Sequence, residues 1–135
     1  MQQPLQEQHT LIISALAQGL LPQTGSIPGA HQLPVTQMIA DVVVQWDSGQ
    51  REIFEQSLLY VDGLALDLLG ARLVDLSDDQ AVHFVSLIAQ SEELSDFWEP
   101  MRKLLVLNYY ALPPVYSELG FPGPSIDNGG LSAFA

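Results

Sequence analysis

Apolar residues recur along the chain three and four positions apart, which is the spacing of helices that bury one face. The longest such segment runs from Gln50 to Leu69, with Phe54, Leu58 and Val61 on one stripe. The same spacing predicts five helices, over residues 5–21, 34–46, 50–69, 77–90 and 97–112. We therefore predict an all-α fold, a single-domain bundle of about five helices.

The stripe positions of the five segments form the predicted core. They are Leu16, Leu20, Ile39, Val42, Phe54, Leu58, Val61, Phe84, Ile88, Leu104 and Leu105. Within the second segment, the run Val42-Val43-Val44 leaves a short strand as an alternative, because β-branched residues favour extended geometry. The helical spacing around the run and the lack of a second strand to pair with it favour a helix.

Three local signals mark helix ends or irregularities. The sequence SDDQ from Ser77 to Gln80 fits a capping box, in which each of these two side chains bonds the main-chain amide of the other residue. Gly63 interrupts the third segment and indicates either the close approach of another helix or a bend. Pro113 and Pro114 end the last helix, because proline cannot donate the helical hydrogen bond.

An irregular loop rich in proline, glycine and tyrosine follows the last helix. Tyr116, Leu119 and Phe121 lie among glycines and prolines, so their side chains need a surface that the loop's own backbone cannot supply. The loop therefore either folds back onto its own helices or docks on a partner. Residues 1–124 form the core and docking loop in this interpretation, and we expect the turn-rich tail of residues 125–135 to be mobile unless bound.

Composition and charge narrow the function classes. With 135 residues the chain is most simply one domain, residues 1–135, and it has no cysteine for a disulfide, a thiol nucleophile or a thiolate metal site. The 16 acidic residues against 4 basic ones give a net charge of −12, which repels nucleic acid and anionic lipid. No apolar run approaches the roughly 20 residues of a membrane-spanning helix. We expect neither nucleic acid as a partner nor direct membrane insertion.

Few residues indicate chemistry of their own. Asp62 and Asp67 suggest an acid–base pair, but their five-residue spacing places them on different faces of a helix and favours solvated or capping roles. His83 lies beside an apolar face, where a half-buried structural role is favoured over a metal ligand, and His9 and His31 are equally isolated. We predict no catalytic, cofactor-binding or metal-binding residue in this chain.

Arg102 and the aromatic residues after it are the candidate binding residues. Arg102 either lies over aromatic side chains at the surface, or uses its guanidinium fork to hold a carboxylate or loop carbonyls. Tyrosines on a loop stiffened by prolines lose little entropy on docking and are frequent at binding hot spots. The predicted partner-binding residues are Arg102, Tyr109, Tyr110, Tyr116, Leu119 and Phe121. In the competing interpretation these rings pack back onto the bundle.

Three stretches resemble one known family. In the last third of the chain, RKLLVLNYY leads through a proline-bearing loop to GFPGP, a run similar to the C-terminal signature of the gluconate 2-dehydrogenase subunit 3 family. Residues 10–30 resemble the opening helix of that family, and residues 63–89 resemble its central helix pair. The resemblance spans nearly the whole chain. It departs in the insert after the tyrosines, which is shortened to ALPPVYSE, and in the absence of a twin-arginine export signal before the first helix.

That family consists of small, non-catalytic partners of flavin-dependent sugar and polyol dehydrogenases. The resemblance implies that this chain binds a large FAD-dependent (GMC-type) dehydrogenase subunit and helps it to fold or to acquire its flavin. It also implies that the FAD, the substrate pocket and the catalytic base belong to the partner. A cytochrome c subunit is a further candidate member of the complex.

Two functions of other classes stay open. One is a stand-alone enzyme that uses Asp62, Asp67 and Arg102 in a cleft between helices, and the other is a free-standing acidic helical adaptor.

The sequence leaves the compartment open. No basic region precedes the apolar run that begins at Leu11, so we predict no signal peptide. The chain is then cytoplasmic, or it reaches the periplasm with an exported partner or after removal of a leader.

Overall fold

The computed structural model describes residues 4–117, which form an all-α domain. Its helices are α1 (Glu7–Leu20), α2 (Val35–Val43), α3 (Ser48–Leu69), α4 (Asp78–Ala89), α5 (Ser95–Tyr110) and the short α6 (Pro113–Tyr116), with 3-10 turns η1 (Ala30–Gln32) and η2 (Leu73–Asp75). Within residues 4–117 the extended pairing is limited to one isolated bridge between Thr24 and Ile27. The predicted fold class and the five main helices are confirmed.

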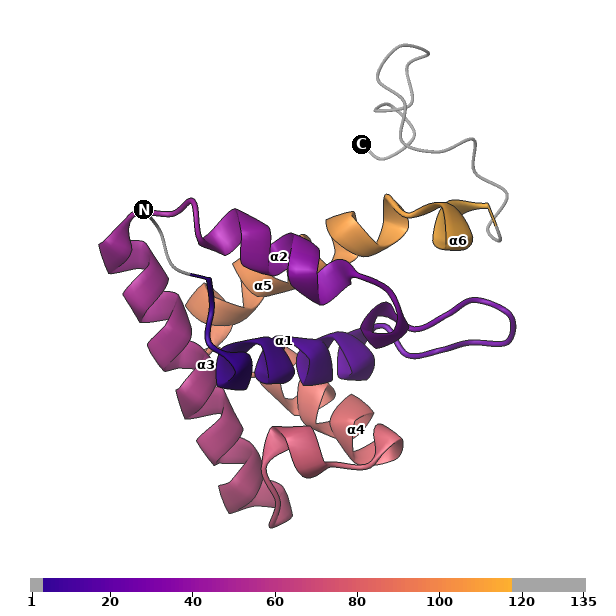
Figure 1. Ribbon diagram of the computed structural model, residues 1–135. Helices are drawn as coiled ribbons and strands as arrows, with labels where there is room; N and C mark the ends of the chain where they lie inside the picture. Colours follow the sequence, from indigo (N-terminus) through magenta and orange to yellow (C-terminus); the bar gives the residue numbers. More distant parts are fainter. Residues whose placement is uncertain (1–3, 118–135) are drawn as a thin grey trace.

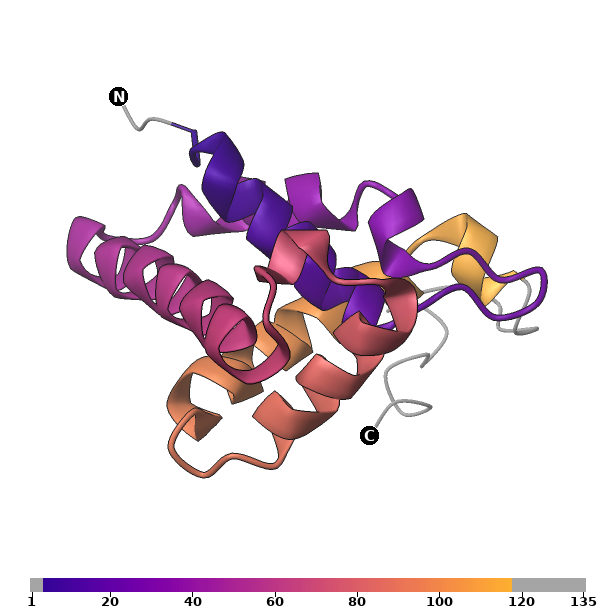
Figure 2. The same cartoon turned by 90° about the horizontal axis from the view of Figure 1, so that it is seen from below.

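Helix α1 is the centre of the arrangement (Figure 1). It packs most extensively on α4, and it also contacts α2, α3 and both 3-10 turns. Helix α2 contacts α5, which crosses behind α1, and α6 packs on the end of α5. Seen from below, α3 lies to one side of the group formed by α1, α4 and α5 (Figure 2).

The contact between α1 and α4 is close because its residues are small. A Cβ atom added at Gly19 of α1 would lie 2.5 Å from both the Ala81 carbonyl oxygen and the Val85 Cγ2 of α4. Ala15 and Ala17 of α1 are also buried. Such side chains let two helix backbones approach until little space is left between them.

Side-chain caps fix where two of the helices begin. The Gln80 amide donates to Ser77 Oγ (3.3 Å) and the Ser77 amide donates to Gln80 Oε1 (3.1 Å), so the predicted capping box is confirmed. The Gln50 amide donates to Asp47 Oδ1 (2.9 Å), which starts α3 two residues before the predicted position. Gly70 ends α3 with φ of 79°, a left-handed conformation that glycine adopts without strain.

The predicted core is largely correct. Its buried members are Leu16, Ile39, Phe54, Leu58, Val61, Phe84, Ile88 and Leu105, and Leu20 and Leu104 are half-buried against it. The exception is Val42, whose side chain is 39% exposed. Val35, Ile39 and Val43 are fully buried instead, because α2 contacts the core along the i, i+4, i+8 line and Val42 lies one position off it.

Gly63 does not mark the close approach of another helix, which was one of its two predicted roles. Nothing lies within 4 Å of a Cβ atom added there, and α3 is continuous from Ser48 to Leu69. The glycine that marks a close helix approach is Gly19. Pro113 and Pro114 do follow the end of α5, and they also open α6, where proline is tolerated because the first amides of a helix need no partner within it.

Candidate functional site

The two adjacent tyrosines at the end of α5 occupy different environments. Tyr109 is 4% exposed, and its hydroxyl donates a 2.7 Å hydrogen bond to the Pro28 carbonyl in the loop between α1 and η1. Tyr110 is 37% exposed and packs edge-on against the Tyr109 ring, with ring centroids 5.0 Å apart. Tyr109 therefore packs back onto its own chain, and Tyr110 covers it from outside.

The environment of Tyr109 also shifts its acidity. Burial raises the pKa of the Tyr109 phenol above its usual value of 10.0, and the neighbouring Tyr110 raises it further by charge repulsion. The neutral hydroxyl is the form that can donate to the Pro28 carbonyl. This contact holds the α1–η1 loop against α5 as long as the phenol stays protonated.

The other predicted partner-binding residues are spread out. Tyr116 is half-buried on α6, next to the fully buried Val115. Arg102 pairs with Glu99 one turn earlier on α5, with 3.4 Å between Nη2 and Oε2, and the two side chains are 41% and 56% exposed. Leu119 and Phe121 lie outside the described residues. A partner contact at Arg102, Tyr110 and Tyr116 stays a prediction.

A second candidate surface, which we did not predict, lies between α3 and α5. A hollow of about 450 Å3 opens there; its lining is Trp46, Gln50, Ile53, Phe54, Ser57, Asp96, Phe97, Pro100, Met101 and Leu104. Two further hollows adjoin it along α3. The first shares Ile53 and Phe97 with it and reaches Tyr60 and Leu94, and the second shares Tyr60 and Leu94 and reaches Leu64, Leu68 and Leu87 on the α4 side. We call this whole surface the α3 groove.

Aromatic residues form the base of the α3 groove and hold its walls apart. Phe54 of α3 lies edge-on to Trp46, with centroids 5.4 Å apart, and its ring is 6.2 Å from that of Phe97 on α5. Ile53 stands on the rim with 67% of its surface exposed, and Tyr60 with 52%. The signal in the sequence was the apolar residues Ile53 and Tyr60, which flank the buried stripe of α3.

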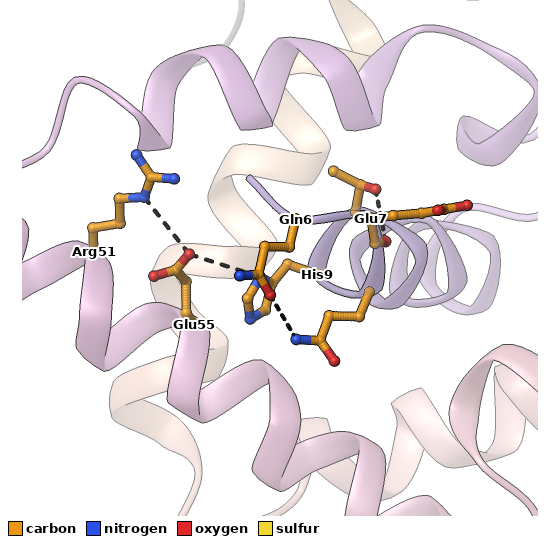
Figure 3. Close-up of polar contacts among 7 residues, drawn as sticks. Gln6, Glu7, His9, Arg51 and Glu55 are labelled. Carbon is orange, nitrogen blue, oxygen red and sulfur yellow. Dashed lines mark hydrogen bonds and ion pairs between the residues drawn. The ribbon is translucent and has the colours of Figure 1, made fainter. Parts of the chain in front are cut away.

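A polar cluster joins the start of α1 to α3 (Figure 3). His9 Nδ1 lies 3.7 Å from Glu55 Oε2, and Arg51 Nε lies 3.6 Å from the same oxygen. A histidine beside a carboxylate is a common acid–base arrangement, but here His9 is buried, with 5% of its surface exposed. The cluster instead attaches α1 to α3. His9 is thus not isolated as predicted, and His83 is exposed where we expected it half-buried.

The two aspartates of α3 do not form a pair. Asp62 is 7% exposed; its Oδ1 accepts the Leu73 amide (3.0 Å) and its Oδ2 lies 3.5 Å from Arg72 Nη1. Asp62 therefore caps η2, which agrees with the capping role predicted from its position, although it is not solvated. Asp67 is exposed to solvent. Arg102 pairs with Glu99 on α5, so these residues do not assemble into an acid–base site.

Within residues 4–117, no three histidine, aspartate or glutamate side chains gather in a way that could hold a metal ion. Within the same residues, no helix combines the length and the apolar character needed to cross a membrane.

The comparisons with known proteins add one finding to this geometry. Residues 7–123 match the family model described as gluconate 2-dehydrogenase subunit 3. No curated protein and no solved structure matches the chain.

Proposed function

The chain belongs to the gluconate 2-dehydrogenase subunit 3 family, a small subunit of a dehydrogenase complex, and from this membership we propose that it is a non-catalytic subunit. Its partner is a large FAD-dependent (GMC-type) dehydrogenase that oxidises a sugar or another alcohol. The FAD, the substrate pocket and the catalytic base belong to that partner. The small subunit binds it and supports its folding or flavin loading.

The observation that carries this proposal is the extent of the family match. The match begins at Glu7, the first residue of α1, and runs past Tyr116, the last residue of α6. It therefore covers every described helix of the domain. The whole folded unit, rather than one short motif, is the unit that the family shares.

The distribution of exposed apolar side chains supports a subunit that has a partner. Single exposed apolar residues are common on any protein. Here Ile53, Tyr60 and Leu68 follow one another along a single helix and border the α3 groove. A contiguous apolar surface of this kind is typical of a protein–protein interface.

Co-expression tests the proposal. The chain carries an affinity tag and is expressed with a large FAD-dependent dehydrogenase from the same organism. We expect a complex that shows flavin absorbance and oxidises the sugar or alcohol, whereas the chain expressed alone is colourless and inactive. The dehydrogenase expressed without the chain should contain less FAD. A flavin-loaded or active preparation of this chain alone would refute the proposal, as would a dehydrogenase that is never retained.

A further inference from the structure

We propose that the α3 groove binds an amphipathic helix of the large dehydrogenase subunit, one that carries lysine or arginine beside its apolar stripe. The inference rests on the proposed function and adds to it the binding surface and the chemistry of the partner segment. The surface is separate from the tyrosines at the end of α5. It depends on three observations: the shape of the groove, its apolar lining and its charge.

The shape of the groove fits a helix. Its lining runs along α3 from Ile53 to Leu68, which is about 22 Å at 1.5 Å per residue. The opposite wall comes from α5 and then from the segment around Leu94. A docked helix of about four turns would span this length and place apolar side chains at i, i+3, i+4 and i+7 along it.

The apolar lining has an accessible rim and a fixed base. Ile53 and Tyr60 are more than half exposed, so a partner can cover substantial apolar area at the rim. Phe54 and Met101 are buried beneath them, and Phe54 is held between the rings of Trp46 and Phe97. The base is therefore already formed before a partner arrives, and little ordering entropy is lost on binding.

The charge of the groove identifies the occupant. Glu93 and Asp96 line it, and no lysine or arginine does. The ion pairs within residues 4–117 involve neither of these two carboxylates, and Arg51 and Arg102 are paired with Glu55 and Glu99. Lysine or arginine on the partner would complement these carboxylates.

The same charges disfavour the other occupants. A second copy of this chain carries the same net charge of −12 and would bring the same carboxylates to the contact. The chain's own residues 118–135 contain no lysine or arginine. An anionic membrane surface would be repelled by the groove.

A matched pair of variants tests the groove. Ile53→Ser removes an apolar side chain that is 67% exposed on the rim, and Leu107→Ser removes one that is 71% exposed on α5 and does not line the groove. Binding to the purified large subunit is measured with the full chain, and circular dichroism verifies the fold of each variant. We expect Kd to rise about tenfold or more for Ile53→Ser, and to change less than twofold for Leu107→Ser.

The outcomes separate this inference from the proposed function. If the wild-type chain binds the dehydrogenase and both variants bind equally well, the groove is not the interface and the inference is overturned, while the proposed function stands. If the wild-type chain binds no dehydrogenase, the proposed function fails and the inference fails with it.

The role of the groove's carboxylates and the identity of the segment that occupies the groove are tested in the same complex. The double change Glu93→Gln with Asp96→Asn should weaken binding about three- to tenfold at low salt and flatten its salt dependence, whereas Asp41→Asn on the exposed side of α2 should not. A photo-crosslinker in place of Ile53 should label a helix of the large subunit that contains lysine or arginine. Labelling of residues 118–135, of a second copy or of lipid would overturn the inference.

Discussion

Two pairs of helices, α1 with α4 and α3 with α5, show how one type of sequence pattern produces two different surfaces. The contact between α1 and α4 is closed: Gly19 brings the backbones so close that no Cβ atom would fit. The contact between α3 and α5 is open: the rings of Phe54, Phe97 and Trp46 hold the helices apart and leave a groove. Both contacts are built from apolar stripes, and the size of the side chains decides which one closes.

Within residues 4–117, polar contacts attach α3 to α1 and to η2. His9 of α1 lies near Glu55 of α3, and Asp62 of α3 accepts the Leu73 amide of η2. On the groove side, Ile53 and Tyr60 are apolar and aromatic rim residues that are more than half exposed. The edge of α3 that faces α1 and η2 helps to hold the fold together, and the edge that borders the α3 groove is available for binding.

The largest expected difference between the two sides comes from truncating one aliphatic side chain on each. Leu16 of α1 is 0% exposed, so Leu16→Ala should lower the free energy of unfolding by about 2–5 kcal/mol through lost burial and a cavity. Ile53→Ala on the groove rim should change it by no more than about 0.5 kcal/mol. Urea unfolding of both variants measures this. Equal losses would mean that the groove rim is part of the core.

Two glycines within helices, Gly19 of α1 and Gly63 of α3, sharpen the comparison. Gly19→Ala places a methyl group 2.5 Å from the Ala81 carbonyl oxygen, and we expect a loss of about 1–3 kcal/mol as α1 and α4 move apart. Gly63→Ala meets nothing within 4 Å and should gain about 0.5–1 kcal/mol from the better helix propensity of alanine. Thermal melts of the two variants should therefore shift in opposite directions; shifts of the same sign would contradict this packing.

The attachment of α3 to η2 is tested with the two aspartates. Asp62→Ala leaves the buried Leu73 amide without its acceptor and should cost about 1–3 kcal/mol. Asp67→Ala removes an exposed carboxylate of the same helix and should be nearly neutral. If the complex with the dehydrogenase lost its activity in both variants while both stayed folded, the two carboxylates would have a chemical role that our account lacks.

The smallest expected effect concerns pH. The pKa of Tyr109 is higher in the folded chain than its usual value of 10.0, so the unfolded state ionises first and stability should fall as the pH rises above about 10. Tyr109→Phe should cost about 0.5–1.5 kcal/mol at neutral pH, since the bond to the Pro28 carbonyl is lost, and should reduce the alkaline fall. Tyr60→Phe, at a ring that is 52% exposed, is the control. An alkaline fall that is unchanged in Tyr109→Phe would contradict this assignment.

The sequence was sufficient for features that depend on local pattern. Helical spacing located α1 to α5, and the residues from Ser77 to Gln80 located the start of α4, because a capping box depends on residues three positions apart. We predicted Val42 in the core, whereas its neighbour Val43 is the buried residue. In a run of three valines, the neighbouring helices decide which side chain is buried.

The candidate site was harder to predict, because it depends on contacts between distant segments. Asp62 accepts the first amide of η2, His9 lies beside Glu55, and Tyr109 donates to the Pro28 carbonyl. No local spacing in the sequence predicts these contacts. The α3 groove is equally non-local, since Phe97 becomes its wall only when α5 crosses near α3. The sequence did indicate that Tyr109 and Tyr110 matter, but not that one is buried and the other exposed.

Hydrogen exchange on the chain, alone and in complex with the large dehydrogenase subunit, tests the central claim that the open side binds the partner. Amides of α3 and of the first half of α5 should exchange more slowly in the complex, because the docked helix prevents these segments from opening. Amides of α1 and α4 along their closed contact should change little. Protection that appears only along α1 and α4, or only around Tyr110 and α6, would contradict the account.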